Sequence, residues 1–340
     1  MPSVQLSNVI VPQVFNRYMV EDTMIKTAIF QSGVMRADPS MADFLKGGGL
    51  TVNMPFWMDL DSKSPGIAND NPASIATPGI VAAANNLAIR NVRTRGWSAA
   101  NLTAELAGSD PMMRIRERVS NYWSRAFQRH LVSELVGVFA SNAANNGGDM
   151  QNVIGLDVAG APTSANLVSA GALLDTAQTM GDQGMTALGL LICHSVIATA
   201  LRKQNLIDFI PDSEGHVRFE TYMGYKMIVD DGCPVVQGTT NTARYLYTSY
   251  LLGEGAFGWA EAPVAIPVET FRHPEQGNGM GVEDLWTRRQ YLMSPMGVKW
   301  TDSSRAGQFP TDAENQMAAN WLRIFPERKQ VRMAALISNG

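Results

Sequence analysis

Apolar residues recur at helical spacing through the centre of the chain. Over residues 111–143 they are three and four positions apart, which gathers them on one face of a helix with about 3.6 residues per turn. The residues are Ile115, Val119, Tyr122, Trp123, Ala126, Phe127, Leu131, Leu135 and Val138. Asp110 is a preferred N-cap, Pro111 suits the first helical position, and the Asn-Asn-Gly-Gly run at 145–148 ends the pattern. The pattern predicts a single helix of about eight turns that packs along one face.

A period of two precedes this helix. Leu50, Val52, Met54 and Phe56 alternate with Thr51, Asn53 and Pro55, which predicts a half-buried strand. Pro55 lacks a backbone N–H and therefore favours an edge strand. A polar, proline-rich segment over 59–79 leads to a returning strand over 85–97. We expect a long hairpin whose tip is too polar for a core and needs a partner surface.

The first 45 residues carry apolar residues without a sustained period, apart from one short helical pattern over 16–30. This composition predicts an extended arm that does not fold alone.

Helical and strand patterns alternate from about residue 160. We expect helices over 172–180 and 195–204, and strands over 188–194, 225–229 and 243–252. These elements predict an α/β region built around one central sheet. A long strand or strand pair over 283–301 follows the glycine-rich turn at 274–281 to form a second hairpin, and a terminal strand lies within 326–338.

The composition is that of a folded protein, with 340 residues, 45% hydrophobic and 17% charged. A net charge of −4 gives no overall basic field for nucleic acid. Cys193 and Cys233 are too few for a disulfide framework, and we expect small core residues in a reducing compartment. The apolar runs are too short for a membrane span and the first residues lack a signal-peptide pattern, so we expect neither membrane insertion nor export.

Arginine outnumbers lysine by 20 to 7. Arginine is enriched and lysine depleted at protein interfaces, so the bias indicates protein-facing surface, unless it reflects a GC-rich genome. Four arginines share one side of the long predicted helix: Arg114, Arg118, Arg125 and Arg129. This stripe is either a solvated face or a contact with neighbouring subunits or nucleic acid.

No motif indicates catalysis. The Gly-Glu-Gly-Ala-Phe-Gly run at 253–258 matches a dinucleotide fingerprint, but prolines follow it where a helix is needed, so we expect a tight turn. The four histidines have no metal-ligand spacing. The adjacent acids Asp230 and Asp231 precede Gly232 after a predicted strand, and they are read as a turn in preference to an acidic site. We expect no enzyme activity, cofactor or metal.

Several segments in order resemble one protein family, the major capsid proteins of tailed double-stranded DNA bacteriophages with the Hong Kong 97 type fold. They lie at 172–184, 194–215, 221–235, 247–261, 287–301 and 320–340, and they include "HSVIATALRKQNLIDFIPDSEG" and "TYMGYKMIVDDGCPV". The resemblance covers 160–340 by local sequence and the remainder by architecture.

The resemblance implies an α+β fold in four parts. These are an N-terminal arm at 1–46, an extended loop at 47–95, a peripheral domain with a long spine helix at 96–155 and 262–315, and an α/β axial domain at 156–261 and 316–340. It also implies that the arm and the extended loop contact neighbouring subunits.

Two features depart from some relatives. The spine helix begins near 110, which leaves little room for an N-terminal scaffolding segment, so we expect a separate scaffolding protein. Lys63 is the single lysine near the loop tip, and no acceptor for a covalent cross-link is evident. Lys63, Asp230 and Asp231 are candidate interface residues.

The resemblance thus predicts a structural protein that assembles as pentamers and hexamers into an icosahedral virion shell around double-stranded DNA. A portal and a decoration protein are further expected partners, and the host cytoplasm is the expected place of assembly. One alternative is the shell of a bacterial nanocompartment with enzyme cargo. A less favoured alternative is an α/β enzyme that uses the run at 253–258 or the acids at 230 and 231.

Overall fold

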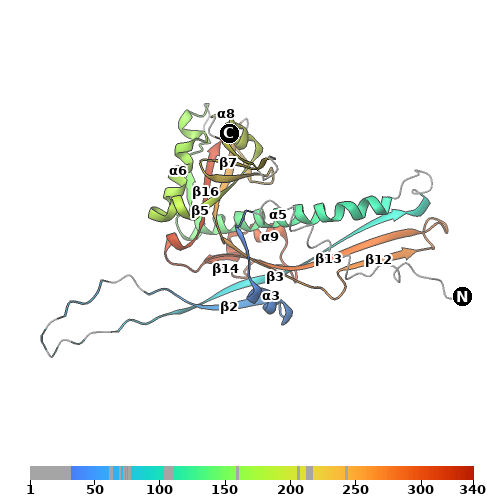
Figure 1. Ribbon diagram of the computed structural model, residues 1–340, viewed down its shortest axis with the longest axis horizontal. Coiled ribbons are helices and arrows are strands. Elements are labelled where there is room, and N and C mark those ends of the chain that lie inside the picture. The colour runs from blue at the N-terminus through green and yellow to red at the C-terminus, as the bar shows by residue number, and fades with distance from the viewer. Residues whose placement is uncertain are drawn as a thin grey trace.

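The fold is taken from a computed structural model, which describes residues 32–60, 64–68, 70, 71, 73, 75, 78–102, 111–157, 161–204, 207–211, 217–241 and 244–340. Two large sheets are arranged around one long helix, α5 (Pro111–Asn145). In Figure 1 a compact α/β unit stands near one end of α5, and long strands run beneath the helix in both directions. The predicted α+β architecture is confirmed.

The sheet beneath α5 has six strands. They are β1 (Met35–Ala37), β11 (Phe257–Ala262), β13 (Val282–Pro295), β3 (Ala83–Ala100) and β2 (Thr51–Trp57) in spatial order, with β12 (Val268–His273) also paired to β13. The predicted hairpin is β2 with β3, and β2 lies at the sheet edge as Pro55 indicated. Val52 is buried whereas Thr51, Asn53 and Pro55 are exposed, so the predicted alternation is confirmed.

Helix α5 packs on one face of this sheet. Every apolar residue of the predicted stripe lies in or against the main hydrophobic core. The helix ends where glycines were expected to end it, since Gly147 and Gly148 take positive φ values of 65° and 71°. Asp110, the predicted N-cap, is outside the described residues.

The opposite face of the sheet is partly covered by α3 (Pro39–Lys46), which the sequence analysis did not predict. Met41 and Leu45 of α3 pack against Leu292 of β13 in a separate small core. Pro39 at the first helical position was a usable signal. The helical pattern expected over 16–30 lies outside the described residues.

The second sheet has eight strands and forms the predicted α/β region. Its order is β4 (Gln151–Val153), β16 (Met333–Asn339), β10 (Tyr245–Gly253), β5 (Leu188–Cys193), β8 (Tyr225–Val229), β7 (Val217–Tyr222) and β6 (Ile207–Pro211), with β9 (Val235–Gln237) paired to β10. The strands over 188–194, 225–229 and 243–252 and the terminal strand are confirmed, whereas the β6–β7 hairpin was not predicted.

Helices cover one face of this second sheet. They are α6 (Ala170–Gln178), α7 (Gly184–Ala187) and α8 (Ser195–Lys203), with the short 3-10 turns η2 (Ser164–Asn166) and η3 (Gly181–Gln183). Leu173 of α6 and Ile197 of α8 share a core with Leu191 of β5. The other face packs on α5, where the rings of Phe139 and Tyr250 stack with centroids 5.3 Å apart.

The segment between β13 and β16 joins the two sheets. It contains β14 (Val298–Trp300), α9 (Asp312–Asn315), η4 (Ala318–Asn320), β15 (Trp321–Arg323) and η5 (Arg328–Gln330). The sequence over 283–301 is therefore two strands, β13 and β14, which was one of the two predicted arrangements. Arg323 pairs with Asp149 at 2.7 Å, and Arg328 donates to the carbonyl oxygens of Asp149, Val331 and Met333.

Cys193 and Cys233 are free and buried, as expected. Burial raises the pKa of the Cys193 thiol to about 12, so the thiol stays protonated and unreactive at neutral pH. None of the described helices is long and apolar enough to cross a membrane.

Candidate functional site

Aromatic contacts fix how α5 is rotated on the sheet. The indole Nε1 of Trp123 donates to Thr287 Oγ1 at 3.1 Å, and the Phe127 ring lies edge-on to Trp259 and Tyr291 at centroid distances of 5.1 and 5.0 Å. A helix anchored by such rings cannot rotate without breaking the core. Its opposite face is therefore held away from the sheet.

The predicted arginines occupy that opposite face. Arg114, Arg118, Arg125 and Arg129 are all exposed. At about 100° per residue they fall within about 60° of the helix circumference and extend along about 22 Å of its axis. We call these four residues the arginine stripe.

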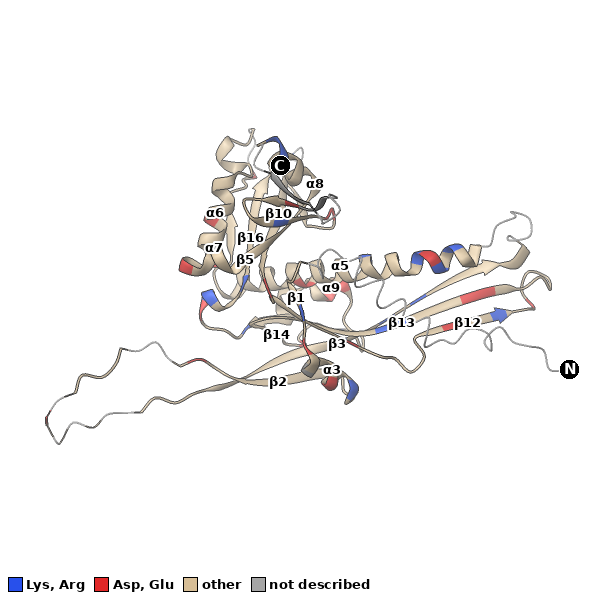
Figure 2. Cartoon of the chain, in the orientation of Figure 1, with Lys and Arg blue, Asp and Glu red and all other residues tan. Residues whose placement is uncertain are grey.

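Little within the described chain neutralises the arginine stripe. Arg114 lies 3.5 Å from Glu117, and both side chains are at least half exposed, so this pair is weak. Arg118 and Arg125 form no ion pair with a described residue. Figure 2 shows several charged residues of α5 close together in its turns farthest from the α/β unit.

Asp230 connects the α/β unit to α5. Its Oδ2 accepts a hydrogen bond from Gln128 Nε2 at 2.6 Å, and its Oδ1 accepts one from the Gly232 backbone N–H at 2.8 Å. Residues 230–233 form the predicted turn, closed by the Cys233 N–H bonded to the Asp230 carbonyl at 3.2 Å. Both carboxylate oxygens of Asp230 therefore have partners within its own chain.

Asp231 instead holds the start of α8. Its Oδ1 accepts the Ser195 backbone N–H at 3.1 Å, and hydrogen bonds with the hydroxyl and N–H of Ser195 lower the pKa of Asp231. The carboxylate side chain remains 69% exposed. Of the two acids, Asp231 is therefore the one whose carboxylate can contact a neighbouring subunit.

Ser195, His194 and Asp231 adjoin one another without forming a catalytic triad. His194 is the N-cap of α8, since its Nδ1 accepts the Val196 N–H at 3.2 Å, and Ser195 is the first residue of the helix. The Ser195 hydroxyl is 3.5 Å from that same nitrogen. Because the Nδ1 lone pair is already engaged by a backbone donor, it is not free to take the serine proton.

The other suspected chemical motifs are turns. Residues 254–256 form the turn between β10 and β11, and a strand follows where a dinucleotide site needs a helix. Among the described residues no group of histidine, cysteine and carboxylate side chains has a metal-binding arrangement.

The loop between β2 and β3 exposes large apolar side chains. Ile67, Ile75 and Ile80 are 94%, 88% and 95% exposed, and Trp57 at the base of the loop is 75% exposed. Lys63 lies outside the described residues, so its predicted interface role is untested. Nothing else in the described chain exposes isoleucine to this degree.

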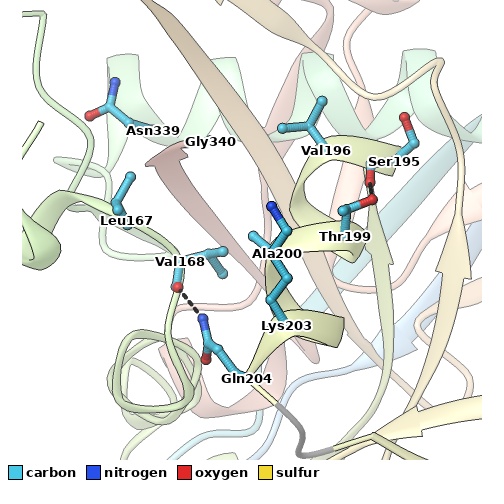
Figure 3. A pocket seen from close by; sticks show the side chains of 10 residues that line it. All are labelled: Leu167, Val168, Ser195, Val196, Thr199, Ala200, Lys203, Gln204, Asn339 and Gly340. Carbon is cyan, nitrogen blue, oxygen red and sulfur yellow. Dashed lines mark hydrogen bonds between the residues drawn. The ribbon is translucent and has the colours of Figure 1, made fainter. Parts of the chain in front are cut away.

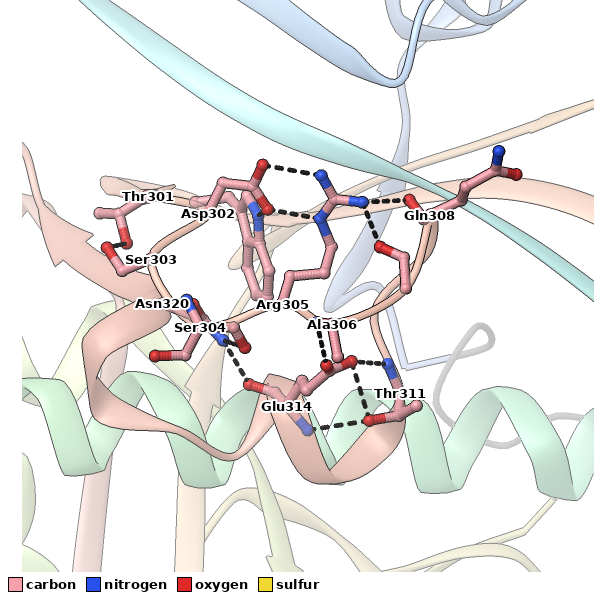
Figure 4. Close-up of polar contacts among 12 residues, drawn as sticks. Thr301, Asp302, Ser303, Ser304, Arg305, Ala306, Gln308, Thr311, Glu314 and Asn320 are labelled. Carbon is pink, nitrogen blue, oxygen red and sulfur yellow. Dashed lines mark hydrogen bonds and ion pairs between the residues drawn. The ribbon is translucent and has the colours of Figure 1, made fainter.

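A second loop, at 301–311, is braced by its own side chains (Figure 4). Arg305 donates to both oxygens of Asp302 and to the carbonyl oxygens of Gly307 and Gln308. Glu314 accepts the N–H groups of Ala306 and Thr311, each at 2.7 Å. This loop was not predicted, although Thr311 followed three residues later by Glu314 is a capping-box signal.

A charged cluster centred on the buried side chains of His130 and Glu134 ties this loop segment to α5. His130 Nδ1 is 3.3 Å from Asp312 Oδ1, and His130 Nε2 is 3.0 Å from Glu134 Oε1. Arg93 Nη2 lies 3.2 Å from Asp312 Oδ1. Burial lowers the pKa of His130, but the carboxylates of Asp312 and Glu134 outweigh it and raise the pKa above its ordinary value. Sequence reasoning missed this cluster because the partners are far apart in the chain.

A cavity of about 490 Å³ lies beside α8 (Figure 3). Val196, Ala200 and Lys203 line one side of it, and Leu167 and Val168 line the other. Gln204 closes the base by donating to the Val168 carbonyl at 2.9 Å. No charged group is buried there, so the cavity has no feature of a catalytic site.

Comparison with known proteins settles the family. No family model matches the chain. The major capsid protein of Bacillus phage SPP1 is 38% identical over 330 residues, which cover 96% of this chain and 95% of that protein. This relative favours the phage capsid over the nanocompartment shell and the enzyme.

Solved capsids share the fold at low identity. The cyanophage Pam1 capsid matches with a TM-score of 0.54 and 10% identity over 92% of each chain. The capsid of Ralstonia phage GP4 matches with a TM-score of 0.51 and 10% identity over 79% of this chain and 86% of that chain. The described residues place a spine-like helix, a projecting hairpin and an α/β unit as the resemblance implied. The chain belongs to the major capsid proteins of tailed bacteriophages and has the Hong Kong 97 type fold.

Proposed function

We propose that copies of this chain assemble as pentamers and hexamers into an icosahedral shell that encloses double-stranded DNA. A capsid protein associates with copies of itself and resides in the virion. The proposal adds the ring sizes, the symmetry and the packaged nucleic acid. The observation that carries it is the long β2–β3 hairpin, which has no packing partner at its tip within the described chain.

The exposed side chains of this hairpin support association with copies of the chain. Clustered exposed apolar residues mark surfaces that bind other proteins. Ile67, Ile75 and Ile80 are almost fully exposed, although a side chain of this size stabilises by about 1.5–3 kcal/mol when buried. A shell repeats each contact many times, so individually weak contacts give a stable lattice.

We also propose the four-part division: an arm at 1–46, an extended loop at 47–95, a peripheral domain, and an axial domain. Sheet pairing argues for one change to the predicted boundaries. Strand β11 (Phe257–Ala262) pairs with β13 in the sheet beneath α5, so the axial domain is better ended near Gly255 than at 261.

The arginine stripe is the proposed contact with DNA. Its exposed cations lie on the face of α5 turned away from the sheet, where they can neutralise backbone phosphates. Cations placed by a helix in this way give binding that does not depend on base sequence. A separate scaffolding protein, a portal and a decoration protein are further proposed partners, with assembly in the host cytoplasm.

Removing the hairpin tip tests the proposal that the hairpin drives assembly. Residues 60–80 are replaced by a two-residue Asn-Gly turn, which suits a two-residue hairpin. We expect a folded protein with an unchanged far-ultraviolet circular dichroism spectrum that sediments as single subunits or small oligomers. The matched control replaces Ile67, Ile75 and Ile80 by valine and should still assemble. Assembly of the shortened chain into shells would contradict the proposal.

A further inference from the structure

Strand β3 extends beyond the end of β2 and has a free edge there. Strand β2 pairs with β3 only up to Ile89, whereas β13 pairs with β3 as far as Ala100. The loop at 305–309 lies beside Arg90 and Val92, around an open cavity of about 790 Å³. From Thr94 to Ala100 no described strand lies on the β2 side of β3.

The ladder shows which backbone groups face that edge. The Arg90 N–H donates to the Leu50 carbonyl on the β2 side at 2.9 Å. Successive residues of a strand point their backbone groups to opposite sides, so Thr94, Gly96 and Ser98 also face the β2 side. Asn101 is one of the alternate residues, whose backbone groups face β13, and its N–H donates to the Gly281 carbonyl oxygen at 3.1 Å. Thr94, Gly96 and Ser98 have no backbone partner among the described residues.

Two of the usual protections against pairing are absent from this edge, and its one charged side chain, Arg95, is exposed. Exposed edges are normally interrupted by proline, a bulge or an inward-pointing charge, or they are covered by another element. Residues 94–100 contain no proline, and the pairing register with β13 is continuous. Such an edge is suited to receive another strand.

We propose that this edge pairs with the same edge of a second copy of the chain, antiparallel and about a twofold axis through Gly96. The inference rests on the proposed shell. A twofold axis at Gly96 fits the strand register, because residues whose backbone groups face the free edge then lie opposite one another. Gly96 lies opposite Gly96 of the second copy, and Thr94 lies opposite Ser98 of the second copy. The two sheets become one continuous sheet.

Side chains match in this register. On the face away from α5, Thr94 meets Ser98, and cross-strand hydroxyl pairs are favourable. On the α5 side the same register places Arg95 opposite Trp97 of the second copy, which sets a cation beside an aromatic ring. Trp97 is held on that side by an edge-on contact with Tyr122, with ring centroids 5.2 Å apart. No like charges lie directly opposite one another. The edge is therefore complementary to itself.

Gly96 permits close approach at the centre. A β-carbon on Gly96 would lie 2.8 Å from the Trp286 ring, so Trp286 already occupies the space above this glycine. The two glycines on the axis add no side chain between the copies. A twofold contact of this kind closes on itself and does not propagate into a fibre. It would join the peripheral ends of subunits from adjacent rings.

A disulfide test distinguishes this pairing from other occupants of the edge. Positions 94 and 98 are about 13 Å apart within one strand, too far for a disulfide, but opposite residues of an antiparallel pair have β-carbons about 5 Å apart. We expect shells of the double variant Thr94→Cys with Ser98→Cys to yield covalent dimers on oxidation. Either single variant should yield none, and Cys193 and Cys233 are buried.

Shells of the double variant without covalent dimers would overturn the inference and leave the proposed function standing. Failure of the unaltered chain to form shells would instead count against the proposed function. Occupation of the edge by residues 1–31 would also overturn the inference.

A proline variant gives a second test. Ser98→Pro removes an N–H that faces the free edge and leaves the bonds of β3 to β13 in place. We expect loss of closed shells with rings and melting temperature unchanged, whereas the control Ser98→Ala should form shells normally. Normal shells from Ser98→Pro would contradict the pairing.

Discussion

Gly137 of α5 has no room for an added β-carbon. A β-carbon there would lie 1.9 Å from the Asn315 carbonyl oxygen and 2.4 Å from Trp321 Nε1. The indole N–H of Trp321 donates to that same carbonyl at 2.7 Å, so added volume displaces a buried hydrogen bond. The glycine thus sets how closely the segment after β14 packs on α5.

We predict that Gly137→Ala lowers the free energy of unfolding by about 1–3 kcal/mol through overpacking. Chemical denaturation of unassembled subunits measures the change. The matched control is Gly171→Ala in α6, where the nearest atom to an added β-carbon is 3.8 Å away, so the better helix propensity of alanine should leave stability unchanged or slightly higher. Equal effects of the two changes would show that the contact at Gly137 is unimportant.

His130 makes stability depend on pH. Because its pKa is raised in the folded state, its contribution is fully present below the unfolded value near 6.5 and is lost as pH rises through the folded value. The pKa of Glu134 is also raised, in its case by burial, so its contribution to stability is lost as pH rises in the same way. We predict that the free energy of unfolding falls as pH increases above about 6.5.

The variant His130→Gln should flatten this pH dependence, because glutamine does not titrate. His273→Gln is a suitable control, since His273 lies outside the cluster with a side chain 29% exposed. Denaturation curves at several pH values compare the slopes. An unchanged slope in His130→Gln would assign the pH dependence to other groups.

At the scale of elements, one face of α5 packs on the core and the opposite face carries the proposed contact with DNA. The arginine stripe lies on the face opposite the aromatic anchors, so its charges can change without disturbing the core. We predict that Arg118→Glu combined with Arg125→Glu permits shells to form but impairs DNA retention. Absorbance ratios and nuclease-protected DNA in purified particles measure the effect.

A matched charge reversal places the same change elsewhere. Arg36 and Lys203 are exposed and lie on β1 and α8, away from the arginine stripe. Replacing both by glutamate should leave DNA retention as in the unaltered protein. Equal loss of DNA from the two double variants would point to net charge as the cause. Normal DNA retention in both would show that the arginine stripe does not bind DNA.

Elements with a strong local period were predictable from sequence. The stripe of α5, the alternation of β2 and the turn at 230–233 each depend on residues close together in the chain. The contacts of Asp230 with Gln128 and of His130 with Asp312 were not predictable, because they join residues more than 100 positions apart. The short helix α3 was missed because eight residues give too little periodicity, although Pro39 marked its start.

The candidate site was only partly predictable for the same reason. The arginines were found because they recur along one helix. The braced loop at 301–311 carries no period, and its rigidity comes from Arg305 contacting main-chain oxygens that sequence patterns do not identify. The free edge of β3 depends on where β2 stops, which only the pairing register shows.

At the scale of the whole molecule, the two sheets are joined as one body. The Phe139–Tyr250 stack and the Gln128–Asp230 hydrogen bond link α5 to the α/β unit, and the Asp149–Arg323 pair links the end of α5 to the segment that joins the two sheets. The β2–β3 tip and the β2-side edge of the distal part of β3 remain without partners in the described chain. Assembly surfaces therefore project from a well-packed centre.

Electron microscopy of the purified recombinant protein tests the central claim most directly. The account predicts closed shells or free rings of five and six subunits, since the exposed hairpin and the free edge both need copies of the chain. Particles no larger than dimers or tetramers, under conditions in which the subunit is folded, would contradict it.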